Sequence, residues 1–242
     1  MMRKICVALM LTICMSTAAV PVWAAEENKT EQNNAVADWD GFVNTVNEAF
    51  TDDWNEMKNA VKDLEDSEKT ADDLAGFMEV MKTSTNTEYE ALKEYQEQSV
   101  GEEGSNQKFI QDSYMDSIKV LWEASQNVTE EDLADHESEF WANWKKGRNE
   151  RYDVIMELFY YLDDTELDEN MVQEIHDKYY EDMILKDDTE SMKRLQNGLG
   201  APADGFIGPG TLGELKKWQK DNKKEVRGII TEELLDEIDG TE

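Results

Sequence analysis

Residues 192–219 read MKRLQNGLGAPADGFIGPGTLGELKKWQ, and this stretch predicts two short helices joined by a tight turn. Leu195 and Leu199 are four residues apart, so both lie on one face of a helix. Gly200 is placed to end that helix, because glycine readily adopts the left-handed conformation that commonly closes one. We therefore expect the chain to leave the helix at residue 200.

The residues that follow predict the turn and two further helices. Gly205 comes after Asp204, a pair typical of tight turns in which glycine takes a positive φ. Pro209 suits the first turn of a helix, where its missing N–H breaks no hydrogen bond. An echo of the same turn at residues 226–231 leads into a third apolar stripe. The apolar positions of the second and third helices are Leu212, Leu215, Trp218, Leu234, Leu235 and Ile238.

This order of residues resembles the peptidoglycan-binding domain family, a small three-helix module attached to many cell-wall hydrolases. The resemblance covers residues 187–242 and implies a three-helix fold and binding to peptidoglycan. Arg227 departs from the family pattern, which often has aspartate in the second turn. The shared elements are Leu195-Gln196, Leu199-Gly200, Asp204-Gly205, Gly208-Pro209 followed by Thr211, and Trp218-Gln219.

The resemblance implies a binding site at the first turn and on the helix after it. Asp204 and Gln219 are candidates for hydrogen bonds to stem-peptide or amide groups, and Trp218 for stacking. The alternative is that Trp218 is a core residue and that Asp204 only caps its own turn. The predicted peptidoglycan-binding residues are Asp204, Gly205, Ile207, Gly208, Thr211, Trp218 and Gln219.

A local basic cluster follows this turn in an otherwise acidic protein. We expect it to be a solvated helix face, with contacts to wall carboxylates as the alternative. Its members are Lys216, Lys217, Lys220, Lys223, Lys224 and Arg227.

Residues 36–186 have the composition and spacing of four to six amphipathic helices, which bury their apolar stripes against one another in a bundle. Thr70 and Thr129 each begin a capped helix, and residues 101–105 form a loop. The tryptophans and tyrosines are expected in the core, with sugar stacking as the alternative. The first stripe is Trp39, Val43, Val46, Phe50, Trp54, Met57, Val61 and Leu64.

The first 24 residues have the order of a secretory signal peptide: basic residues, an apolar run, then small residues at Val22 and Ala24. Residues 25–35 are predicted to be a disordered leader. A membrane anchor is the alternative, but the apolar run is short and is interrupted by Pro21. A lipoprotein signal would use Cys14, but Ile13 precedes it where a small residue belongs. We therefore expect export, to the periplasm or to the cell wall.

The only cysteines, Cys6 and Cys14, both lie in the predicted signal. The mature chain would then have no disulfide and no thiol nucleophile.

The chain carries a formal net charge of −32, concentrated in residues 26–186, which have 43 acidic and 14 basic side chains. Such a chain is repelled by nucleic acid and by anionic membrane surfaces. The acidity is expected to be a solvated surface. A cationic protein partner or loose uptake of divalent cations is the alternative.

The sequence shows no established catalytic motif, metal site or cofactor site. The two histidines, His136 and His176, lack zinc-protease spacing. The stretch 163–174 loosely imitates a calcium loop, but it lacks the central glycine and reads better as a helix boundary. Glu137, in Glu-Ser-Glu-Phe, resembles the opening of lytic transglycosylase sites, although the later Gly-Leu-Met-Gln element of that family is missing.

These observations predict an all-α protein in which an acidic bundle precedes a peptidoglycan-binding-like module at residues 187–242. The expected function is non-catalytic attachment to the wall, with a possible protein partner for the bundle. One alternative is a peptidoglycan hydrolase that uses Glu137. Another is a soluble structural protein whose module no longer binds.

Overall fold

The computed structural model describes residues 38–135 and 137–240. The predicted signal peptide, residues 1–24, and the predicted leader, residues 25–35, lie outside the described residues. Within the described part the chain is helical and forms no strand, which confirms the all-α prediction. An isolated bridge between Met183 and Thr231 is the nearest approach to a sheet there.

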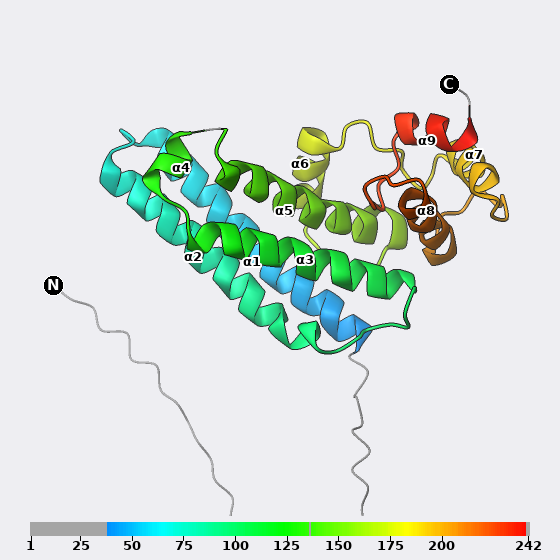
Figure 1. Ribbon diagram of the computed structural model, residues 1–242, viewed down its shortest axis with the longest axis horizontal. Coiled ribbons are helices and arrows are strands. Elements are labelled where there is room, and N and C mark those ends of the chain that lie inside the picture. Colours follow the sequence, from blue (N-terminus) through cyan, green and yellow to red (C-terminus); the bar gives the residue numbers. More distant parts are fainter. Residues whose placement is uncertain (1–37, 136, 241–242) are drawn as a thin grey trace, which may run out of the picture. The chain divides into compact units, whose positions relative to one another are not determined.

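Four long helices form the bundle: α1 (Trp39–Asp66), α2 (Ala71–Leu92), α3 (Asn106–Gln126) and α5 (Glu139–Met156). Figure 1 shows them side by side, and α1 packs on α2, α2 on α3 and α3 on α5. Phe50 on α1 meets Tyr152 on α5 edge to face, with 6.1 Å between ring centroids, so α5 also contacts α1.

Local signals set several of the helix ends. Thr70 and Thr129 both cap helices, as predicted, and each forms a capping box, with Asp73 and Asp132 as the reciprocal partners. The chain after Thr129 forms two helices in succession. The short helix α4 (Glu130–Ala134) ends, the backbone extends, and Ser138 caps α5.

Two irregular turns flank the bundle. A 3₁₀ turn, η1 (Lys93–Gln96), follows α2, and a π-helical turn, η2 (Glu157–Leu162), continues α5. Asp163 ends η2 in the left-handed conformation, and Asp168 caps α6 (Glu169–Tyr179). The stretch that resembled a calcium loop therefore spans a helix boundary.

The core of the bundle is mostly apolar and takes most of the aromatic side chains, although several tryptophans are only half-buried. A polar cluster interrupts this core. Arg151 on α5 donates from Nη1 to Asp53 on α1 at 2.7 Å and also to Glu88 on α2. Tyr114 on α3 donates to Glu88 at 2.6 Å, and Ser84 donates to Asp53. The cluster thus links all four long helices.

The C-terminal module consists of α7 (Thr189–Leu199), α8 (Pro209–Asp221) and α9 (Glu232–Asp239). Gly200 closes α7 at a φ of +72°, and Pro209 occupies the start of α8, both as predicted. Arg194 on α7 binds three carboxylates of α9, Glu232, Asp236 and Asp239, and so ties the first and last helices of the module together.

No helix in residues 38–135 and 137–240 combines the length and apolar character needed to cross a membrane.

Candidate functional site

The turn after α7 is organised by the side chain of Gln196. Its Oε1 accepts a hydrogen bond from the Gly205 backbone N–H at 2.8 Å, and its Nε2 donates to Asp204 Oδ1 at 2.8 Å. The same Asp204 oxygen accepts from the Phe206 N–H at 2.9 Å. These donors favour the carboxylate and lower the pKa of Asp204. Gln196 is buried, so it fixes the turn from inside.

Glycine is required at the centre of this turn. Gly205 has a φ of +82°, and a Cβ there would lie 2.5 Å from Cγ2 of Thr189. The backbone of the turn therefore packs directly on the first residue of α7. A larger residue would separate the two and displace the segment that follows.

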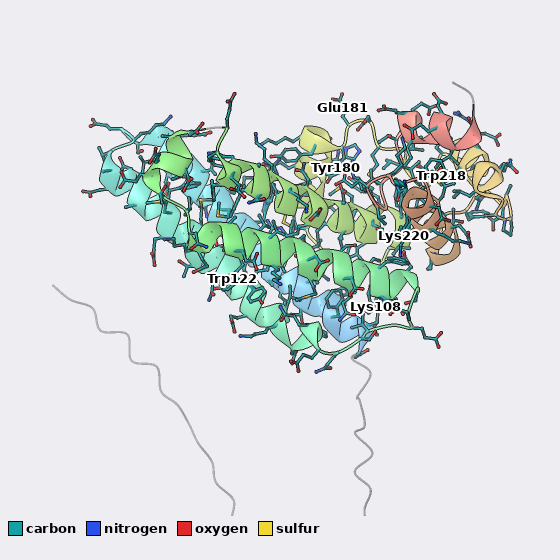
Figure 2. The ribbon with its side chains drawn as sticks, viewed as in Figure 1. Lys108, Trp122, Tyr180, Glu181, Trp218 and Lys220 are labelled. Atoms are coloured by element: carbon teal, nitrogen blue, oxygen red, sulfur yellow. The ribbon has the colours of Figure 1, made fainter. Side chains whose placement is uncertain are left out.

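The structure brings the predicted binding residues into one region but buries most of their side chains. Ile207, Thr211 and Gln219 are buried, and Thr211 accepts a hydrogen bond from Gln196 at 3.3 Å. Trp218, labelled in Figure 2, is half-buried on α8 and packs against the core. Asp204 remains exposed. Thus Asp204 and part of Trp218 are accessible, whereas the side chains of Ile207, Thr211 and Gln219 are not.

Phe206 is the residue that sequence reasoning missed. It is 75% exposed, the largest value among the exposed large hydrophobic side chains of the described residues. Its neighbour Ile207 points inward and is 9% exposed. The sequence shows two adjacent apolar residues here, and only the turn geometry decides which one reaches solvent. A rigid turn therefore presents an aromatic ring beside an exposed carboxylate.

The second turn is held by a glutamine side chain as the first turn is, but it contacts the bundle. Gln219 Oε1 accepts from the Arg227 backbone N–H at 2.9 Å, just as Gln196 accepts from Gly205. The Arg227 guanidinium then donates to Asp153 on α5, from Nε at 2.6 Å and from Nη2 at 2.8 Å. Tyr180 donates to the same carboxylate at 2.6 Å. The second turn is therefore docked on the bundle.

A buried ion pair reinforces this docking. Lys216 on α8 donates to Glu157 Oε1 at 2.8 Å and to Asn106 Oδ1 at 3.2 Å, and the lysine and glutamate side chains are 4% and 2% exposed. Burial raises the pKa of Glu157, and Lys216 opposes that rise. The basic cluster is thus not wholly a solvated helix face, because Lys216 and Arg227 bind carboxylates of the bundle.

A cleft of about 460 Å³ lies where the module meets α3 and α5. Several of its carboxylates have basic partners: Glu157 binds Lys216, Asp153 binds Arg227, and Glu150 lies 3.8 Å from Lys146. Burial raises the pKa of Glu150, and Lys146 partly offsets the effect. These three pairs therefore compensate the charge of half of the six carboxylates that line the cleft.

The alternative catalytic residue, Glu137, is exposed in the turn that precedes α5. It does not line the cleft between the module and the bundle. No group of three or more histidine, cysteine, aspartate or glutamate residues in the described part of the chain is placed to hold a metal ion.

No family model, curated protein or solved structure matches the chain.

Proposed function

We propose that this chain is an exported, non-catalytic protein that attaches to peptidoglycan through residues 204–208 of its C-terminal module. The observation that carries the proposal is the 75% exposed ring of Phe206 on a turn fixed by Gln196. A preorganised turn loses little conformational entropy when a ligand binds to it. An exposed aromatic face offers stacking to a sugar or to an amide plane.

The asymmetry between the two turns supports binding at the first turn alone. The second turn contacts the bundle through Arg227 and lies next to the buried pair of Lys216 and Glu157. A wall strand would have to break these contacts to reach it. The first turn has Phe206 and Asp204 exposed, so it is accessible in the docked arrangement.

The sequence of the first 24 residues supports export, since a wall ligand is reached only outside the cytoplasmic membrane. The acidic bundle would then keep the module soluble and present it to the wall.

The test is co-sedimentation of the mature chain, residues 25–242, with purified peptidoglycan, followed by analysis of the supernatant for released muropeptides. We expect the wild-type chain to pellet and to release nothing. Phe206→Ala should weaken pelleting about tenfold, as expected for loss of an aromatic anchor. Val226→Ala is the matched control, because Val226 is an exposed apolar residue of the second turn.

Two results would overturn the proposal. If the wild-type chain does not pellet, the family resemblance concerns the fold alone and does not extend to peptidoglycan binding. Release of muropeptides would make the protein a hydrolase, and a Glu137→Gln variant would then show whether that residue carries the activity.

A further inference from the structure

A second cavity, of about 510 Å³, opens on the bundle between α1, α2, α5 and α6. It uses the face of α5 that contains Arg148 and Tyr152, whereas the cleft at the module uses the face with Glu150 and Asp153. The two cavities share no lining residue. We call the second cavity the basic groove.

The charge of the basic groove is opposite to that of the bundle as a whole. Its acidic lining residues are Glu65 and Glu174. Residues 26–186 carry three times as many acidic as basic side chains, so a surface lined mainly by basic side chains is not expected from the composition alone. The basic lining residues are Lys58, Lys62, Lys145, Arg148, Arg151 and Lys178.

Four of these cations have no carboxylate partner among the described residues. Lys58 pairs with Glu174, and Arg151 with Asp53 and Glu88. Several lysines elsewhere on the bundle do pair with an acidic residue one helical turn away, as in Lys93–Glu90, Lys108–Asp112 and Lys146–Glu150. Those left without an ion pair in the groove are Lys62, Lys145, Arg148 and Lys178.

The buried side of the groove carries an unsatisfied donor. Arg151 is 4% exposed, and its Nε has no hydrogen-bond partner among the described residues. An unpaired buried donor is destabilising, and most closed cores avoid one. The donor therefore fits a ligand site better than a closed core.

Aromatic rings line the groove and are fixed by their neighbours. Trp54 stacks on Phe50 with 6.3 Å between centroids, and Tyr152 meets Trp54 edge to face at 5.9 Å. The Arg148 guanidinium lies 4.6 Å from the centroid of Tyr179. Trp54, Trp141 and Tyr179 are only half-buried, so each leaves part of its surface accessible. The aromatic lining is thus preorganised, and cations lie beside it.

We propose that the basic groove binds a carboxylate-bearing muramyl peptide, with a sugar ring against the aromatic residues and the carboxylates against the unpaired lysines. This inference rests on the proposed wall attachment, which would bring the ligand to the protein. The volume falls in the range of about 300–1,000 Å³ typical of small-ligand sites, which favours a fragment of this size over a folded partner. Two sites on one chain would raise its avidity for a polymeric wall.

The test is calorimetric titration of the mature chain with a soluble disaccharide tetrapeptide at low and high salt. Lys145→Gln combined with Lys178→Gln should weaken binding about fivefold to tenfold, and this loss should shrink at high salt. The matched control is Lys82→Gln combined with Lys220→Gln, two lysines outside the groove that have no ion pair with described residues. The control should bind as the wild type does.

Three outcomes would overturn the inference: no binding of the disaccharide tetrapeptide, equal affinity of the groove variant and the wild type, or equally tight binding of an acidic peptide without sugar. Phe206→Ala separates the two sites. If this variant alone abolishes muropeptide binding, the wall proposal stands and the groove inference fails. If the groove variant alone weakens binding, and Phe206→Ala changes neither titration nor pelleting, the groove inference stands and the module is not the anchor.

Discussion

Glu88 is buried in the bundle core beside Asp53, and the Arg151 guanidinium is the one cation bonded to both carboxylates among the described residues. Two ionised carboxylates and one guanidinium would leave a negative charge in the core. Burial raises the pKa of Glu88 from 4.5 to about 7, with Asp53 adding to the rise and Arg151 opposing it. Glu88→Gln replaces the acid with a neutral group of the same shape. The Tyr114 hydroxyl can rotate to accept from the new amide.

The size of the effect follows from this shift. The folded protein binds the Glu88 proton more tightly than the unfolded chain does, so the resulting stability is complete below pH 4.5 and is lost as the pH rises through about 7. A shift from 4.5 to about 7 corresponds to about 3 kcal/mol. Between pH 5 and pH 8 the free energy of unfolding of the wild-type chain should therefore fall by about 2–3 kcal/mol relative to that of the variant.

Urea unfolding of both proteins, measured at steps from pH 5 to pH 8, checks this prediction. Repulsion within the acidic surface also grows with pH, but it acts on both chains equally and cancels in their difference. The free energy of unfolding of the variant should rise steadily relative to that of the wild type from pH 5 to pH 8. A difference in unfolding free energy that stays constant from pH 5 to pH 8 would show that the pKa of Glu88 is not raised by folding.

Three further predictions concern the module. Lys216→Met should destabilise the chain by about 3–5 kcal/mol in urea unfolding, because Glu157 is left buried without its cation. Adding Glu157→Gln should recover most of the loss. If Lys216→Met alone is as stable as the wild type, the module does not dock on the bundle through this pair. Gly205→Ala should cost about 1–3 kcal/mol through its positive φ and the contact with Thr189, whereas Gly210→Ala, which has open space around it, should be nearly neutral in thermal unfolding. Arg227→Gln should raise amide hydrogen exchange at residues 226–230 by loosening the second turn from Asp153, and unchanged exchange there would argue against that contact.

The parts of the fold that sequence reasoning predicted are those set by neighbouring residues. Thr70 and Thr129 find their capping partners three residues away, and Gly200 and Gly205 adopt backbone conformations that other residues disfavour. The apolar stripe of α1 likewise repeats within one helix. Such signals are complete within a short window of sequence.

The parts that it missed depend on contacts between distant residues. Arg151 and Asp53 are 98 positions apart, so nothing near either one reveals their pairing. Lys216 lies in a basic run that is typical of a solvated face, and only the packing of α8 against α3 and η2 brings it to Asn106 and Glu157. The gathering of cations in the basic groove has the same origin, because its lysines come from α1, α5 and α6.

The candidate site was predicted in part. The resemblance located the turn, and three of the predicted residues, Asp204, Gly205 and Thr211, hydrogen-bond to Gln196. The pattern did not show that the Gln219 side chain accepts a hydrogen bond from the second turn, or that Phe206 rather than Ile207 is exposed to solvent. The first depends on a hydrogen bond to a residue eight positions away, and the second on backbone geometry that two neighbouring apolar residues do not specify.

The most direct test of wall attachment is an amide chemical-shift titration of the mature chain with soluble peptidoglycan fragments. We expect saturable shifts at the amides of Gly205, Phe206 and Gly208, with the amides of residues 226–228 unaffected. Shifts at the basic groove would report the second site and leave this outcome unchanged. Amides of residues 204–208 that stay unshifted at saturating fragment would contradict attachment through the first turn.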